Sequence, residues 1–98
     1  MSDSYLKRVV TISNRKGLHA RASAKLAKLA ATLPTKVMIT NDGETADARS
    51  IMDLLCLGAA LGTDIMISAS GPSAEIALDK VEALIEDGFG ELDEDCST

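Results

Sequence analysis

The alternation of apolar and polar positions predicts four β-strands along this chain. Val10 and Ile12 share one face of the first strand, and Val37 and Ile39 share one face of the second. The Asn-Asp-Gly turn at residues 41–43 is a strong hairpin signal, so the chain should turn back into a third strand. The predicted strands cover Tyr5–Ser13, Val37–Thr40, Thr45–Ala48 and Asp64–Ser70.

Apolar residues three and four positions apart predict three helices among these strands. The first starts at residue 19, continues through several alanines and leucines, and ends at Pro34. The second is short, covers Ile51–Leu57 and begins at Ser50. The third is amphipathic, with its apolar stripe at Ala74, Ala77, Val81 and Leu84, and its outward acids at Glu75, Asp79, Glu82 and Glu86. The order βαββαβα predicts an α+β two-layer sandwich, in which helices cover one face of a four-stranded antiparallel sheet.

The chain has 98 residues, enough for one domain with a single core. We expect this domain to cover residues 1–88, followed by an acidic, disordered tail over residues 89–98. Tyr5 and Phe89 are its only aromatic residues, so the stacking platforms that bind single-stranded nucleic acid are missing. With no long apolar run and no signal pattern at residues 1–4, we expect a soluble cytoplasmic protein without membrane insertion.

Charge is divided unevenly along the sequence. Residues 1–36 hold eight of the ten Lys and Arg residues but only one of the fifteen acids. Arg21, Lys25 and Lys28 fall at helical spacing and form a basic stripe on the first helix. This stripe is either an ordinary solvated face or a surface that attracts an acidic protein partner. A nucleic-acid partner fits poorly with the acidic remainder.

The two cysteines do not have the spacing of a metal site, and no second histidine accompanies them. We therefore expect no metal. Cys56 lies in an apolar run and is predicted to be a small core residue. Cys96 lies in the acidic tail and is predicted to be an exposed, reduced thiol.

His19 is the single histidine and stands at the predicted start of the first helix. The first N–H groups of a helix have no intrahelical acceptor and lie at the positive end of its dipole, so they stabilise an anion. The backbone of Ala20 and Arg21 is therefore expected to bind a phosphate held on His19, and the Arg21 guanidinium to add charge-assisted hydrogen bonds. Taken alone, a histidine here is more often a capping or surface residue.

The segment Gly17-Leu18-His19-Ala20-Arg21 resembles the active-site signature of HPr, the histidine-containing phosphocarrier family of the phosphoenolpyruvate-dependent phosphotransferase system. The resemblance covers roughly residues 5–88 and implies an open-faced β-sandwich, with Nδ1 of His19 as the phosphoryl acceptor. It implies a carrier with a phosphohistidine intermediate and no cofactor, rather than an independent turnover enzyme. One position departs from the family pattern, because Ala22 stands where proline usually follows the arginine, which loosens the turn.

A second segment, Ala48–Gly58, resembles the part of the family around its regulatory serine, and Ser50 is the matching residue. Ser50 is also a good helix cap, and capping is the commoner explanation of a serine at such a position. Both roles are compatible. Phosphorylation of Ser50 would add negative charge at a helix N-terminus and repel an acidic partner.

The family surface implies docking through Ala20, Ile51, Met52 and Leu55, and we expect Ile51 and Met52 to face solvent. The implied partners are enzyme I as phosphoryl donor, enzyme IIA domains as acceptors and a serine kinase/phosphorylase acting on Ser50, with the carrier itself a monomer. Sugar uptake and the nitrogen-related branch both remain open. Two other hypotheses are a regulatory binding module controlled through Ser50 and a hydrolase or isomerase using His19 as general base, which lacks partner residues.

Overall fold

The computed structural model describes residues 5–90. The observed order of strands and helices is the predicted βαββαβα, followed by one 3₁₀ turn. Within residues 5–90 no helix is long and apolar enough to cross a membrane. The elements are β1 (Tyr5–Thr11), α1 (Ala20–Ala31), β2 (Val37–Asn41), β3 (Glu44–Asp47), α2 (Ile51–Leu57), β4 (Asp64–Ser70), α3 (Ala74–Glu86) and the 3₁₀ turn η1 (Gly88–Gly90).

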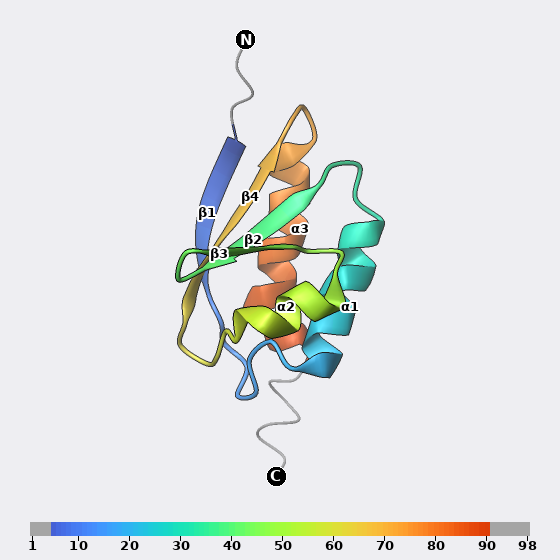
Figure 1. Cartoon of the computed structure of the whole chain (residues 1–98). Helices are drawn as coiled ribbons and strands as arrows, with labels where there is room; N and C mark the ends of the chain where they lie inside the picture. Colours follow the sequence, from blue (N-terminus) through green and yellow to red (C-terminus); the bar gives the residue numbers. More distant parts are fainter. Residues whose placement is uncertain (1–4, 91–98) are drawn as a thin grey trace.

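The four strands form one antiparallel sheet in the order β1-β4-β2-β3. β4 is therefore an inner strand, with Ile65 opposite Val10 on β1 and Ile67 opposite Ile39 on β2. The three helices lie on one side of this sheet (Figure 1). The other side, here called the open face, includes Lys7 and Val9 of β1. The predicted α+β open-faced sandwich is confirmed.

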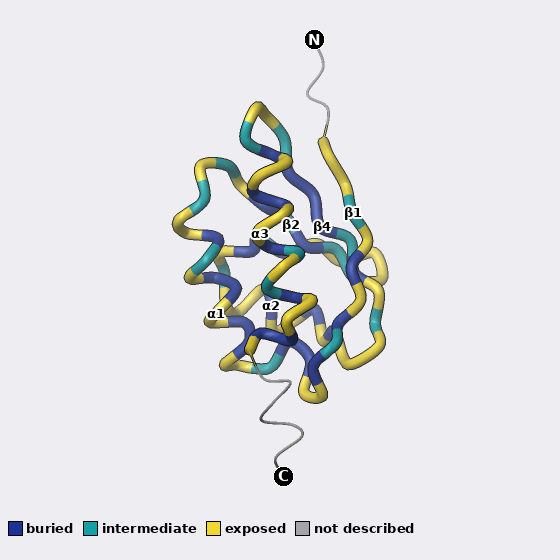
Figure 2. The backbone as a smooth tube through the Cα atoms, turned by 180° about the vertical axis from the view of Figure 1, so that it is seen from behind, coloured by how far each residue is buried: buried dark blue, intermediate teal, exposed yellow. Residues whose placement is uncertain are grey.

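The core lies between the sheet and the helices, where buried residues from both layers meet (Figure 2). Alternate positions of β1, β2 and β4 point into it, as the sequence pattern predicted. Aliphatic side chains dominate because the chain has almost no aromatic residues. The largest fully buried side chains are Phe89, Ile12, Leu26, Ile39, Leu54, Ile65, Ile67, Leu78, Ile85, Val37 and Val81.

Two predicted elements are longer than the observed ones. β1 ends at Thr11, and the Ser13 hydroxyl donates a 2.9 Å hydrogen bond to the carbonyl oxygen of Ile85 instead of continuing the strand. α1 ends at Ala31, where the amide of Thr32 bonds to the carbonyl of Leu29 and tightens the last turn before Pro34.

Arg8 connects the sheet to the last helix. Its guanidinium donates hydrogen bonds of 2.5 Å to Asp79 and 2.9 Å to Glu82 on α3. These two carboxylates raise the pKa of Arg8 above its ordinary value, chiefly through the hydrogen bond to Asp79. Asp79 and Glu82, which belong to the predicted outward face of α3, therefore bind Arg8 of β1.

The predicted boundary between the domain and its tail, after residue 88, is wrong at Phe89. This side chain is fully buried in the core, in the η1 turn that follows α3. Its carbonyl oxygen accepts a 2.7 Å hydrogen bond from Nζ of Lys25 on α1. The fold therefore includes residues through Gly90, while residues 91–98, with Cys96 and the rest of the expected tail, lie outside the described residues.

The prediction that Cys56 is a core residue is also wrong, because its side chain is exposed. α2 is a short helix that buries only Leu54 and Leu57. These two positions are three apart and face the sheet, so Cys56 lies outside the buried stripe. The apolar run covers most of α2, but only one side of the helix is buried. Several apolar side chains of α2 are therefore exposed to solvent.

Candidate functional site

His19 occupies the N-cap position of α1. Its backbone is extended, with φ −79° and ψ −175°, and its imidazole does not cap the helix. The carbonyl oxygen of His19 accepts the first helical hydrogen bond, 2.8 Å from the amide of Ser23. The amides of Ala20 and Arg21 therefore precede the helical ladder and face the end of the helix where the dipole is positive.

The loop before His19 is attached to the segment after α2. The amide of Leu18 donates a 2.9 Å hydrogen bond to the carbonyl oxygen of Ala59, and the Leu18 side chain is buried. Gly17 has φ +64°, and a Cβ there would lie 2.8 Å from Cα of Ala60. The side-chain amide of Asn14 donates a 2.9 Å bond to the carbonyl of Gly17. These contacts fix the loop that carries His19.

The predicted basic stripe is exposed along α1, since Arg21, Lys25 and Lys28 are all solvent-accessible. Arg21 lies two residues after His19, in the first turn. Lys25 is held by the carbonyl of Phe89, as described above. Lys28 borders a depression of about 350 Å³ between α1 and α3, which is lined by Lys25, Lys28, Leu29, Thr32 and Leu84.

Ser50 is the N-cap residue of α2, as predicted. Its hydroxyl oxygen accepts a 3.2 Å hydrogen bond from the amide of Asp53. The capping role is therefore present in the structure. Ser50 is only partly buried, so its hydroxyl stands at the surface beside the first turn of α2.

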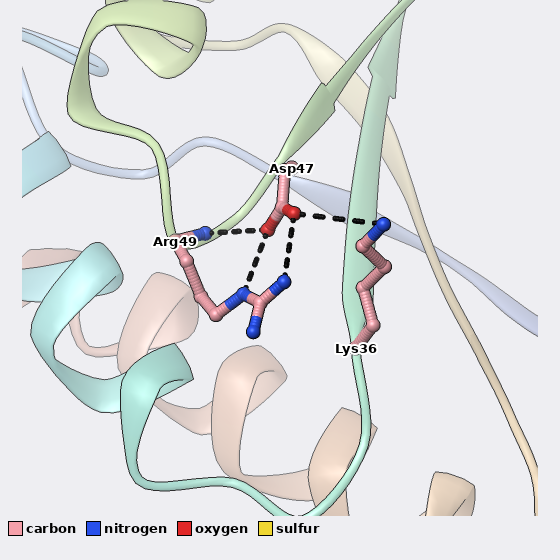
Figure 3. Close-up of polar contacts among 3 residues, drawn as sticks. All are labelled: Lys36, Asp47 and Arg49. Atoms are coloured by element: carbon pink, nitrogen blue, oxygen red, sulfur yellow. Dashed lines mark hydrogen bonds and ion pairs between the residues drawn. The ribbon is translucent and has the colours of Figure 1, made fainter.

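Asp47 organises the turn that leads to Ser50 (Figure 3). Oδ1 of Asp47 accepts hydrogen bonds from the amide of Arg49 at 2.9 Å and from its Nε at 3.3 Å. Oδ2 lies 3.2 Å from Nη2 of Arg49 and 3.8 Å from Nζ of Lys36. The side-chain hydrogen bonds from Arg49 are the largest cause that lowers the pKa of Asp47 below its ordinary value.

Apolar side chains of α2 are exposed, as the sequence predicted. Met52 is 68% exposed, Ile51 40% and Leu55 36%. Ala20, at the start of α1, is also exposed, and the two helices pack against each other. α1 and α2 therefore present one surface that contains the start of α1 and the apolar side of α2.

The sequence interpretation missed the support that residues 59–61 give this site. The backbone of Ala59 and Ala60 contacts the loop at Gly17 and Leu18, and Leu61 is 56% exposed directly after it. The available signal was Leu61 itself, an apolar residue that belongs to no predicted element and precedes the turn residue Gly62.

A model of the protein family "PTS HPr component phosphorylation site" matches residues 6–87. The phosphocarrier protein HPr of Cupriavidus necator is 43% identical over 86 residues, which are 88% of this chain and 97% of that protein. The phosphocarrier protein NPr of Escherichia coli K12 is 41% identical over 87 residues, covering 88% of this chain and 97% of that protein.

Solved structures show the same likeness in three dimensions. A phosphocarrier protein HPr from Bacillus anthracis matches with a TM-score of 0.80 at 31% identity, over 85% of this chain and 99% of that one. HPr-C-His from Thermoanaerobacter tengcongensis matches with a TM-score of 0.82 at 32% identity, over 88% of this chain and 97% of that one.

Proposed function

This chain belongs to the HPr family of phosphotransferase-system phosphocarrier proteins, and on that premise we propose that His19 is the residue that carries the phosphoryl group. The observation that carries the proposal is the position of His19 as N-cap of α1, with its imidazole not used as the cap. The only histidine of the chain therefore stands where a helix terminus stabilises an anion.

The transfer is an in-line displacement at phosphorus. The lone pair of Nδ1 in the neutral His19 imidazole attacks the phosphorus atom held by the donor. The bond between phosphorus and the donor atom breaks, and its electron pair returns to the donor. Positioning and charge stabilisation supply most of the catalysis in such a step. In the second half of the cycle, an acceptor attacks the same phosphorus and the Nδ1–P bond breaks.

Arg21 and the first-turn amides are proposed to hold the phosphoryl oxygens. The guanidinium of Arg21 supplies planar donors two residues from His19, and the amides of Ala20 and Arg21 precede the helical ladder. These donors stabilise the charge that is shared among the oxygens during transfer. A carrier must also release the group, and solvent-exposed contacts of this kind hold a phosphate without trapping it.

Ala22 replaces the family's proline without opening the first turn to solvent. Its side chain is fully buried against the core. Packing therefore restrains the start of α1 at the position where a proline ring would restrain φ. We propose that the acceptor site works with this alanine.

Enzyme I is proposed as the donor and enzyme IIA domains as the acceptors, bound in turn on the surface that α1 and α2 share. Exposed Ile51, Met52 and Leu55 give this surface apolar contact area beside Ala20. Ser50 lies at the start of the same helix. Phosphorylation there by a serine kinase would place negative charge on the docking surface and slow transfer.

The test is incubation of the protein with phosphoenolpyruvate and purified enzyme I, followed by intact-mass analysis. We expect one phosphoryl group that is labile in acid and stable in base, and none on the variant His19→Ala. The unfolding midpoint of the variant, measured beside that of the wild type, shows whether the variant is folded. An unmodified wild-type protein, with the donor active on another HPr, would overturn the carrier role and favour the Ser50 module.

The acceptor defines the branch of the system. Relatives named HPr and NPr match this chain at 43% and 41% identity, so sequence likeness favours neither. Phosphorylated protein mixed with a sugar-specific enzyme IIA and, separately, with its nitrogen-related counterpart should lose the group to one of them faster.

A further inference from the structure

The depression between α1 and α3 has an apolar floor. The two helices are neighbours in the helical layer (Figure 2), and Leu29 of α1 and Leu84 of α3 line the space between them. Both leucines pack against the core, and both are only partly buried. Leucine surface therefore remains open to solvent in a concave space of about 350 Å³.

Lysines stand around this floor. Lys25 and Lys28 line the depression from α1. Lys80 is one turn before Leu84, so it lies on the same side of α3. Within residues 5–90 the side chains of Lys28 and Lys80 form no ion pair or hydrogen bond. Lys25 gives one of its three donors to the carbonyl of Phe89. Donors for an anion therefore remain at the edge of the depression.

The four acids of α3 lie on the other side of that helix. Asp79 and Glu82 bind Arg8 on β1, and helical spacing places the remaining two with them. Asp87, the last residue before η1, is the acid that lies on the side of Leu84. Among the described residues, the three lysines therefore outweigh one acid around the depression. Charge complementarity favours an anionic occupant.

The size of the depression favours a small molecule over a protein. Five residues line it, whereas a stable protein interface uses about 20–30 residues on each side. Pockets for small ligands start at about 300 Å³ and are mostly apolar, with a few polar groups that orient the ligand. A leucine floor with ammonium groups at its edge has this composition, and it matches a ligand with an apolar body and one negative end.

We propose that this depression binds a small amphiphilic carboxylate. Its hydrocarbon chain lies on Leu29 and Leu84, and its carboxylate accepts hydrogen bonds from the ammonium group of Lys28. Lys28 is nine residues after His19, which is about 14 Å along the axis of a helix. The site is therefore separate from the candidate acceptor site, and the inference does not depend on the proposed function.

The probe is octanoate, titrated into the full chain while the NMR shifts of the backbone amides are recorded. We expect saturable shifts at Leu29, Thr32 and Leu84. Octylammonium has the same chain with the opposite charge, and butanoate has the same head group with four fewer methylenes. Each should bind about tenfold more weakly than octanoate. Equal affinities for octanoate and octylammonium would overturn the proposal, and so would octanoate shifts confined to α2.

Lys28→Gln removes the ammonium group and keeps a residue that favours a helix. The Kd of octanoate should rise about fivefold, as expected for the loss of one exposed ionic contact. Lys7→Gln is the matched control, because it makes the same change of charge on the open face of the sheet. It should leave the Kd unchanged. Urea unfolding shows that both variants are folded, and an unchanged Kd in the Lys28 variant would contradict the proposed contact.

Other occupants of the depression give different results. If its amides shift as the protein alone is concentrated, the occupant is a second copy of the chain. If purified enzyme IIA broadens these amides and octanoate does not, the occupant is a protein. Either result would overturn the assignment to a small carboxylate. Octanoate binding is measured without phosphoryl transfer, so a failure of the carrier role leaves this inference standing.

Discussion

The backbone amide of Leu18 donates a 2.9 Å hydrogen bond to the carbonyl oxygen of Ala59. This bond joins the loop before α1 to the segment after α2, which are about forty residues apart in the sequence. The neighbouring Gly17 lies against Ala59 and Ala60, where a side chain does not fit. The position of His19 therefore depends on close packing of two separate segments.

Gly17→Ala should lower the free energy of unfolding by about 3 kcal/mol, because it combines a left-handed backbone with a steric clash. Gly58→Ala is the matched control, since Gly58 has the same φ of +64° but its Cβ would meet open space. The control should cost only about 1 kcal/mol. Urea unfolding of both variants measures the difference, and equal losses would contradict the clash.

Replacements of Ser50 separate its two roles. Ser50→Ala removes the oxygen that accepts from the Asp53 amide and should cost about 1 kcal/mol, with the transfer rate unchanged. Ser50→Asp keeps a capping oxygen and adds charge, so stability should stay near the wild type while transfer from enzyme I slows. Thermal unfolding and initial rates provide the two readouts. Slower transfer in the alanine variant would assign the effect to the cap.

Met52→Asp should slow phosphoryl transfer severalfold without unfolding the protein, because Met52 is 68% exposed and belongs to the proposed docking surface. Ile76→Asp is a control on another helix, where Ile76 is 57% exposed. Figure 1 shows the start of α3, which holds Ile76, at the opposite end of the molecule from the start of α1. Steady-state kinetics with enzyme I should show a raised KM for Met52→Asp alone.

Asp47 should contribute to stability in a pH-dependent way. Its hydrogen bonds from Arg49 lower its pKa in the folded state, so the folded chain prefers the charged carboxylate. The contribution is complete above the unfolded pKa of about 3.9 and is lost as the pH falls through the lower folded value. We expect Asp47→Asn to cost at most about 1 kcal/mol at neutral pH, since the pair is partly exposed.

A double-mutant cycle with Arg49→Gln checks the same contact. Urea unfolding of the four proteins at neutral pH should give a coupling energy between positions 47 and 49. This energy should decline as the pH falls through the folded pKa of Asp47, which lies below the unfolded value of about 3.9. A coupling that persists in acid would contradict the ion pair as its source.

Periodic segments of the sequence predicted the elements well. α2 at Ile51–Leu57 and β4 at Asp64–Ser70 appear residue for residue, because a capping serine, two glycines and strict apolar alternation mark their limits. Exposure of Ile51 and Met52 followed from the narrow buried stripe of a short helix. Where local chemistry sets a boundary, the sequence alone was sufficient.

Errors arose where the deciding contact comes from a distant segment. Cys56 lies in an apolar run, and only the packing of α2 on the sheet shows that Leu54 and Leu57 fill the buried stripe. Phe89 stands between glycines before an acidic stretch, yet it is drawn into the core while its carbonyl binds Lys25. The hydrogen bond from Leu18 to Ala59 likewise joins two backbone groups, so no pattern of side chains in the sequence predicts it.

The position of β4 between β1 and β2 has a consequence for synthesis of the chain. β1 pairs with β4, from Thr11 opposite Asp64 to Tyr5 opposite Ser70, so the first strand made by the ribosome has no partner until residues 64–70 emerge. The β2–β3 hairpin forms earlier but remains detached from β1 without β4. Such non-local pairing delays folding until late in translation. A prematurely terminated chain that stops before β4 therefore contains His19 in an unfolded peptide. Such a peptide lacks the folded acceptor site and does not compete with the complete protein for the phosphoryl donor.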